Sequence, residues 1–111
     1  MNKSDTLAEI EIGLLSDDEK NELLDQLRQE IDKIDDSIIN LLQSRAGKTE
    51  LLGTLKKQLG TGNYSPVREK EIIKRVSKKD TINLSSMDIV RIFERIIDVS
   101  RAIQKRARDK E

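Results

Sequence analysis

Residues 24–59 read LDQLRQEIDKIDDSIINLLQSRAGKTELLGTLKKQL, and this stretch decides the fold. Apolar residues recur in it every three or four positions, as they do along one side of an α-helix. These residues are Leu24, Leu27, Ile31, Ile34, Ile38, Leu41, Leu52, Leu55 and Leu59. Upstream, Ser16 and Glu19 have the spacing of a capping box, and Gly60-Thr61-Gly62-Asn63 predicts a turn downstream. The stretch therefore predicts one helix of roughly 43 residues, about 64 Å long at 1.5 Å per residue.

A helix of this length has no place to fold back within a chain of 111 residues. Its apolar side must be covered by another molecule, most simply by a second copy of the chain. The composition agrees, because 38% of the residues are charged and only 2% are aromatic. So short and polar a chain buries a modest core by itself. We therefore expect a homodimer.

Two further helix starts follow the long helix. Ser65-Pro66 combines an N-cap with a proline at the first helical position, and it predicts a short helix that ends near residues 78–80. Ser85 and Asp88 begin a medium helix with an apolar stripe. The predicted fold class is all-α, with three helices per chain. Residues 1–15 fit either a frayed end or a short helix, and we treat residues 1–19 as an N-terminal extension.

Composition also excludes several functions. The formal net charge is zero, which gives no overall attraction to nucleic acid, and Tyr64 and Phe93 are the only rings for stacking on bases. The chain has no cysteine or histidine, so disulfides, thiolate metal sites and histidine ligands are ruled out. We find no secretory signal and no apolar run of membrane-spanning length. The expected compartment is the cytoplasm.

Arg45 stands where the apolar pattern calls for a leucine. One interpretation is a device that sets the register of a coiled coil, or a side chain whose stem packs while its guanidinium reaches solvent. The other is a pocket for an anionic ligand. Lys56 lies eleven residues later, which at about 100° per residue places it within about 20° of Arg45 on one face. Two long cationic side chains there can reach one small molecule, whereas Lys48 is expected to reach solvent.

Other polar residues raise the same question. Arg28 lies about 25 Å before Arg45 along the helix. It can reach the same ligand only from an antiparallel second copy, and taken alone it is typical of a surface arginine. Ser100 interrupts the apolar stripe of the medium helix, and Gln104 lies one turn later. These two side chains either satisfy each other and the backbone or face the same pocket.

Arg68 and Glu69 open the short helix just after its cap and, taken alone, are typical of surface charges. Gly47 is an unusual choice inside a long helix, where it costs about 1 kcal/mol relative to alanine. Close approach of another helix is the explanation that we consider for it.

Four segments in this order resemble the all-helical chorismate mutase family: LRQEIDKIDDSIINLLQSR (27–45), GTLK (53–56), SPVRE (65–69) and IIDVSRAIQ (96–104). The resemblance covers residues 20–108, which we expect to form a chorismate mutase-like helical domain. It implies an intertwined homodimer with two equivalent sites, each built from both chains. The family's site positions match Arg28, Arg45, Lys56, Arg68, Glu69, Ser100 and Gln104, with Arg28 arriving from the other chain.

The activity that the resemblance implies is an isomerase reaction, the rearrangement of chorismate to prephenate in phenylalanine and tyrosine biosynthesis. Because it is intramolecular, it needs no nucleophile, metal or cofactor. By family analogy Arg28 and Arg45 hold the two carboxylates, and Ser100 assists. Lys56 and Gln104 donate hydrogen bonds to the ether oxygen, which gains negative charge as the C–O bond breaks. Lys56, Gln104 and Arg45 are thus the expected catalytic residues.

The remaining roles concern the ring hydroxyl of the substrate. Glu69 is expected to accept a hydrogen bond from it, while Arg68 adds positive potential and orients Glu69. Ser65 stands where the family often has aspartate, so one contact near this hydroxyl is altered. Gln104, unlike a glutamate, has no titrating proton, which predicts weak pH dependence.

Two alternatives keep the fold and change the reaction: an isochorismate pyruvate lyase and a mutase acting on 4-amino-4-deoxychorismate. A third alternative, a helical dimerisation module without catalysis, explains the apolar pattern and the charge content. It leaves Arg45, Lys56, Ser100 and Gln104 as coincidences. A second enzyme of the shikimate pathway is a candidate partner, for which residues 1–19 offer a contact.

Overall fold

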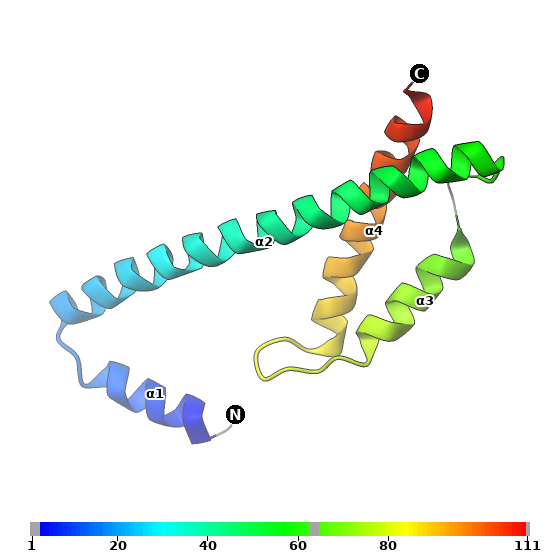
Figure 1. Ribbon diagram of the computed structural model, residues 1–111. Helices are drawn as coiled ribbons and strands as arrows, with labels where there is room; N and C mark the ends of the chain where they lie inside the picture. Colours follow the sequence, from blue (N-terminus) through cyan, green and yellow to red (C-terminus); the bar gives the residue numbers. More distant parts are fainter. Residues whose placement is uncertain (1–2, 63–64, 111) are drawn as a thin grey trace. The chain divides into compact units, whose positions relative to one another are not determined.

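A computed structural model of the protein describes residues 3–62 and 65–110 (Figure 1). Asn63, in the predicted turn, lies outside these residues. The described chain forms four helices and no strand: α1 (Lys3–Gly13), α2 (Asp17–Leu59), α3 (Pro66–Ser77) and α4 (Ser86–Asp109). The predicted all-α class is confirmed. The predicted count of three helices is wrong for the described chain, because α1 is a fourth.

α1 covers the segment for which the sequence left a frayed end or a short helix open. Its apolar residues are spread around the helix and form no stripe. Ile10 and Ile12 are exposed. A helix without an apolar side produces no 3.6-residue signal, which is why the sequence did not separate it from a frayed end.

α2 begins and ends where its caps predict. The backbone N–H of Ser16 donates to Glu19 Oε1 over 2.9 Å, and the backbone N–H of Glu19 donates to Ser16 Oγ over 3.1 Å. These bonds confirm the capping box, and they lower the pKa of Glu19 because they favour its charged form. At the other end, Gly60 has a φ of +72°, and its N–H donates to the carbonyl of Lys57. The left-handed conformation of a glycine at this position is a common way to end a helix.

The chain divides into two compact units, residues 1–41 and 42–111, and α2 begins in the first and ends in the second. In the first unit the apolar stripe of α2 is exposed, with 44% to 72% of each residue accessible to solvent. The stripe consists of Leu24, Leu27, Ile31, Ile34, Ile38 and Leu41. The first unit therefore has an apolar helix side without cover within one chain.

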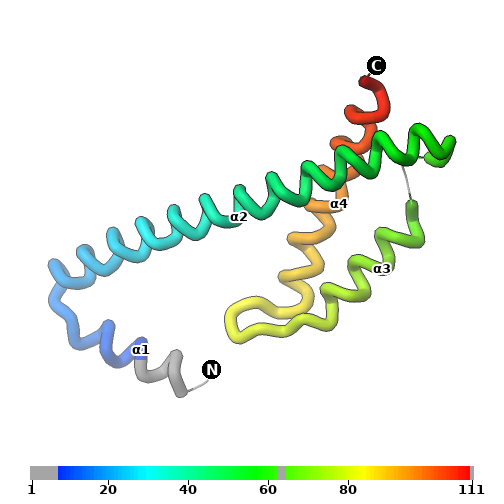
Figure 2. The backbone as a smooth tube through the Cα atoms, viewed as in Figure 1, coloured from blue at the N-terminus to red at the C-terminus, as the bar shows by residue number. Residues whose placement is uncertain are grey.

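The second unit holds the small core. α3 and α4 pack side by side and run in opposite directions (Figure 2). Ile72 and Val76 from α3 and Ile97 from α4 are buried between them, and Ile73 and Phe93 are among the residues that pack against this cluster. The pairing of α3 with α4 is what places polar residues of both helices near the C-terminal half of α2.

The starts of α3 and α4 also agree with the predicted caps. Ser65 Oγ accepts a hydrogen bond from the backbone N–H of Arg68 over 3.3 Å, and Pro66 is the first residue of α3. Ser85 and Asp88 form a complete capping box at the start of α4. Within the described ranges, no helix has the length and apolar character needed to cross a membrane.

Candidate active site

The second unit contains a cavity of about 290 Å³ lined by residues of α2, α3 and α4 and by Ser65. Six of the seven predicted site residues line it: Arg45, Lys56, Arg68, Glu69, Ser100 and Gln104. Arg28 is exposed, belongs to the first unit and is not among the lining residues. One chain thus brings together every predicted site residue except the one that was expected from a second copy.

α2 contributes four residues that follow one another at helical spacing, namely Arg45, Thr49, Leu52 and Lys56. Side chains three or four positions apart share a helix face, so the stripe that is apolar in the first unit becomes the wall of the cavity in the second. Lys48 is exposed, as predicted. Of the two interpretations of Arg45, its place in the cavity wall favours a ligand pocket over a side chain that merely reaches solvent.

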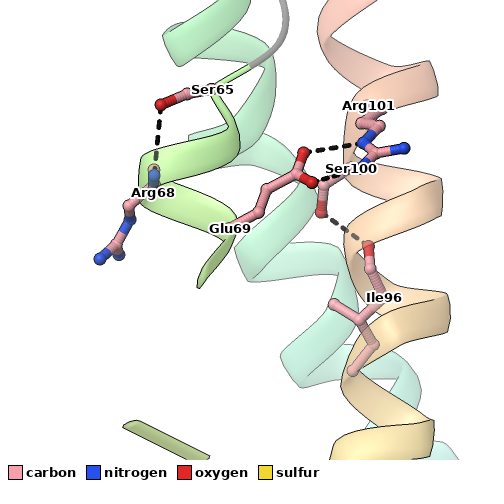
Figure 3. Close-up of polar contacts among 6 residues, drawn as sticks. All are labelled: Ser65, Arg68, Glu69, Ile96, Ser100 and Arg101. Carbon is pink, nitrogen blue, oxygen red and sulfur yellow. Dashed lines mark hydrogen bonds and ion pairs between the residues drawn. The ribbon is translucent and has the colours of Figure 1, made fainter. Parts of the chain in front are cut away.

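Arg45 is half-buried and donates a hydrogen bond from Nη1 to Ser100 Oγ. Ser100 Oγ in turn donates to the backbone carbonyl of Ile96 over 2.8 Å (Figure 3). Burial lowers the pKa of Arg45, and the positive charges of Arg68 and Arg75 lower it further. Among the described residues Arg45 forms no ion pair with a carboxylate. Its charge is therefore held in place by a neutral hydroxyl.

Lys56 and Gln104 connect α2 to α4 on the same wall. Lys56 Nζ donates to Gln104 Oε1 over 2.7 Å. Gln104 and Ser100 do not satisfy each other. Instead, each accepts a hydrogen bond from a cationic side chain of α2, Ser100 from Arg45 and Gln104 from Lys56. Both therefore face the cavity, which was one of the two interpretations open for them. Since the amide oxygen of Gln104 accepts from Lys56, its amide nitrogen is the group left to donate.

Gly53 explains how α2 comes this close to α4. A Cβ at position 53 would lie 2.7 Å from the backbone oxygen of Gln104 and 3.0 Å from its Cα. Only glycine fits there without moving backbone atoms. A Cβ at Gly47 would meet nothing within 4 Å among the described residues. Close approach of another helix of the same chain is therefore the wrong explanation for Gly47. The glycine that lies against α4 is Gly53, six positions later in α2.

Glu69 is oriented by Arg101 and not by Arg68, which corrects the predicted role of Arg68. Arg101 Nε donates to Glu69 Oε2 over 2.7 Å, and Arg101 Nη2 donates to Glu69 Oε1 (Figure 3). The guanidinium of Arg68 points away and meets Glu71 Oε2 at 3.4 Å. Consecutive helical residues point about 100° apart, so Arg68 and Glu69 face different neighbours.

The pKa of Glu69 lies below its usual range. The side-chain hydrogen bonds from Arg101 are the main cause, and the positive charges of Arg101 and Lys56 act in the same direction, although burial opposes them. The carboxylate is thus held ionised. It is also the one carboxylate among the described residues that line the cavity, next to four cationic side chains.

Sequence reasoning missed two polar residues that line the cavity, Thr49 and Arg101. Thr49 is buried, and its Oγ1 donates to the carbonyl of Arg45 over 2.9 Å. Its position one turn after Arg45 on the same face is a signal that could have identified it. Arg101 has no comparable signal, because its partner Glu69 lies 32 residues earlier and the two meet only through the pairing of α3 with α4.

The charges of the cavity suit a small anion with more than one acidic group. Arginine binds carboxylates through parallel hydrogen bonds, and burial strengthens such contacts. In the part of the chain that the structure describes, no group of three or more histidine, cysteine, aspartate or glutamate side chains could hold a metal ion. The residues that line the cavity supply hydrogen-bond donors and positive charge.

Several known proteins are similar to this chain in sequence and in fold. The family described as chorismate mutase type II matches residues 27–105. A chorismate mutase of Methanocaldococcus jannaschii is 33% identical over 85 residues, which span 76% of this chain and 86% of that protein. A crystal structure of chorismate mutase from Helicobacter pylori in complex with prephenate has a TM-score of 0.72 and 30% identity, and the match covers 81% of this chain and 99% of that chain.

A second solved structure, the Form II structure of chorismate mutase from Thermus thermophilus, has a TM-score of 0.71 and 26% identity, with 75% of this chain and 94% of that chain covered. The family match takes in the greater part of the chain, including Arg28 and the six predicted site residues that line the cavity. The matches in sequence and in structure agree with the resemblance seen in the four segments. The chain belongs to the chorismate mutase type II family.

Proposed function

We propose that the protein is an isomerase that converts chorismate to prephenate by an intramolecular [3,3] rearrangement, in the biosynthesis of aromatic amino acids. The observation that carries the proposal is the set of cationic side chains in one small cavity, where Arg45 is half-buried and bonded to a neutral hydroxyl. The relative from Helicobacter pylori was crystallised with prephenate, the product of this reaction.

The first task of the site is to hold a flexible dianion in the compact chair that reacts. Arg45 binds one carboxylate with its guanidinium, and Ser100 keeps that guanidinium in place. Arg68 adds positive potential, which is consistent with its effect on the pKa of Arg45. Glu69 accepts a hydrogen bond from the ring hydroxyl. Fixing the reacting carbons close together in this way removes much of the entropic part of the barrier.

The second task is electrostatic. As the C–O bond breaks, negative charge grows on the ether oxygen, and donors aimed at this oxygen stabilise the transition state more than the substrate. Lys56 and the amide nitrogen of Gln104 are those donors. Their mutual hydrogen bond of 2.7 Å holds both groups in position before the substrate arrives. Less reorganisation is then needed during the reaction.

We further propose that the working enzyme is a homodimer and that Arg28 enters each site from the other chain. The exposed apolar stripe of α2 supports this, because each leucine or isoleucine contributes about 1.5–3 kcal/mol when it is fully buried. Arg28 lies on this same helix, among the stripe residues. We assign residues 20–108 to the catalytic domain and residues 1–19 to an extension. A partner enzyme and the cytoplasm remain predictions from the sequence.

Formation of prephenate from chorismate by the purified chain tests the proposed reaction. Lys56→Ala should lower kcat by about 10²- to 10³-fold, as loss of a transition-state hydrogen-bond donor does elsewhere, while the circular dichroism spectrum stays unchanged. Lys57→Ala is the matched control, because Lys57 is the next residue on α2 and lies outside the cavity. Equal losses in both variants would contradict the role of Lys56.

The same assay separates the alternatives. Isochorismate should yield no salicylate, and 4-amino-4-deoxychorismate should be a poorer substrate than chorismate. A chain that turns over none of the three compounds would be a helical dimerisation module. The relatives described above are chorismate mutases, and no contact in the described cavity favours a lyase.

A further inference from the structure

Arg101 is a charged residue that lines the cavity and to which neither the sequence pattern nor the proposed chemistry gives a role. It follows Ser100 on α4 and lies against Glu69 of α3. Both of its donating nitrogens meet different oxygens of this carboxylate, an arrangement that is both strong and geometrically specific. The Glu69 side chain is only 18% exposed, and both residues of the pair line the cavity.

We propose that Arg101 is a specificity-determining residue: by neutralising Glu69, it makes the site prefer a substrate with an uncharged ring hydroxyl over one with an ammonium group at that position. The inference rests on the proposed function and names the substrate feature that this end of the site selects. It concerns discrimination between two substrates and leaves the rearrangement itself unchanged.

The two substrates would meet different environments at Glu69. A carboxylate offers about four lone-pair positions, so Glu69 can accept from a hydroxyl while two hydrogen bonds from Arg101 remain. An aliphatic ammonium gains little from a carboxylate whose charge is already compensated. It would also approach Arg101 itself and enter a cavity with three further cations, Arg45, Lys56 and Arg68. Like charges in such close contact are strongly unfavourable.

Removing the positive charge of Arg101 should reverse this preference in part. In Arg101→Gln the carboxylate of Glu69 loses its hydrogen-bonded cation and attracts an ammonium more strongly. Arg101→Lys keeps the positive charge and should therefore keep the preference. Glu69→Gln removes the negative charge and should shift the preference further toward the hydroxyl substrate. The substrate preference is thus expected to shift toward the amine in the first variant, to stay unchanged in the second and to shift toward the hydroxyl in the third.

The experiment measures kcat/KM of the full chain for chorismate and for 4-amino-4-deoxychorismate, in which an amino group replaces the ring hydroxyl. This amine is protonated at pH 7, as aliphatic amines are. Arg101→Gln should raise the ratio of amine to hydroxyl substrate by about tenfold or more, in line with the usual cost of like charges in contact. Arg95→Gln is the control, because Arg95 is a cation of α4 that is 88% exposed and pairs with Asp98 outside the cavity.

Three results would overturn the inference. An unchanged ratio in Arg101→Gln, with both efficiencies lowered equally, would mean that Arg101 binds a group common to both substrates. The same shift in Arg101→Lys as in Arg101→Gln would mean that charge is not the cause. If Arg101→Gln does not fold, the direction of the shift in Glu69→Gln decides, and a shift toward the amine substrate would overturn the inference. Failure of the wild-type chain to form prephenate is a separate result, which contradicts the proposed function itself.

Discussion

At the residue scale, the positive charge that lines the cavity is the feature with the most direct chemical consequence. Arg45, Lys56, Arg68 and Arg101 line the cavity together with one carboxylate among the described residues, Glu69. The pKa of Arg45 is lowered because burial and its positive neighbours disfavour the charged form. A bound dianion supplies the negative charge that offsets the repulsion from these neighbours, so substrate binding and the charge of Arg45 support each other.

The same residues predict a flat pH profile. Gln104 has no titrating proton, and a guanidinium such as that of Arg45 stays protonated in proteins. Arg101 lowers the pKa of Glu69, so this carboxylate is ionised above its folded pKa and loses its charge only as the pH falls below the usual range of glutamate. We expect kcat/KM for chorismate to vary by less than about threefold between pH 5 and 8.

A steep fall within that interval would contradict the assignment of Gln104 and Glu69. Arg101→Gln provides an internal check, because loss of the hydrogen bonds returns the pKa of Glu69 toward its ordinary value. The acid limb of this variant should therefore move to higher pH than that of the wild-type enzyme.

At the element scale, the contact between α2 and α4 sets the geometry of Lys56 and Gln104, the two proposed hydrogen-bond donors. Gly53 lies three residues before Lys56, one turn along α2, and directly against the backbone of Gln104. The hydrogen bond from Lys56 to Gln104 therefore depends on a helix separation that only glycine permits. A small residue outside the cavity thus controls the distance between two groups inside it.

Gly53→Ala should separate the helices and lower kcat about tenfold or more, with a smaller change in KM, because the displaced donors act mainly in the transition state. Overpacking of this kind also destabilises proteins by about 1–3 kcal/mol. Gly47→Ala is the matched control on the same helix. It should keep kcat and raise stability by up to about 1 kcal/mol, the difference in helix propensity. Steady-state kinetics and thermal denaturation of both variants test this prediction. Equal kcat values in the two variants would contradict the role of Gly53 in setting the separation of α2 and α4.

At the scale of the whole molecule, each site of the proposed dimer is built from the first unit of one chain and the second unit of the other. A single chain carries both features: the exposed stripe of α2 in its first unit and the cation-lined cavity in its second. Arg28 belongs to the first and the remaining site residues belong to the second. If the proposal holds, neither activity nor stability belongs to a single chain, and both depend on protein concentration.

Mixing of two inactive variants tests the shared site. In a mixed dimer of Arg28→Ala and Lys56→Ala chains, one site lacks both residues and the other is intact. Random pairing makes half of the dimers mixed, so co-refolding of equal amounts should restore about a quarter of the wild-type activity. A pair of Arg45→Ala and Lys56→Ala chains is the control, and it should restore none because both residues come from the same chain. No recovery in the first mixture would contradict a site built from two chains.

The sequence by itself determined three of the four described helices and the face of α2 on which the candidate site lies. The starts of α2, α3 and α4 and the end of α2 follow from caps, turn residues and apolar spacing, because these signals are local: Ser16 with Glu19 and Ser85 with Asp88 are each three residues apart. Arg45 and Lys56 were found for the same reason, since helical periodicity places them on one face whatever surrounds it. α1 was not determined, because it has no apolar side to reveal it.

Only the tertiary structure decided which side chains from different helices meet. Glu69 pairs with Arg101 across 32 residues, and Gly53 rather than Gly47 lies against α4. Such contacts depend on how α3 and α4 pack and on where α4 crosses α2, which no local pattern records. Periodicity specifies the direction of a side chain from its own helix axis, but the partner in that direction is set by packing between segments far apart in the chain.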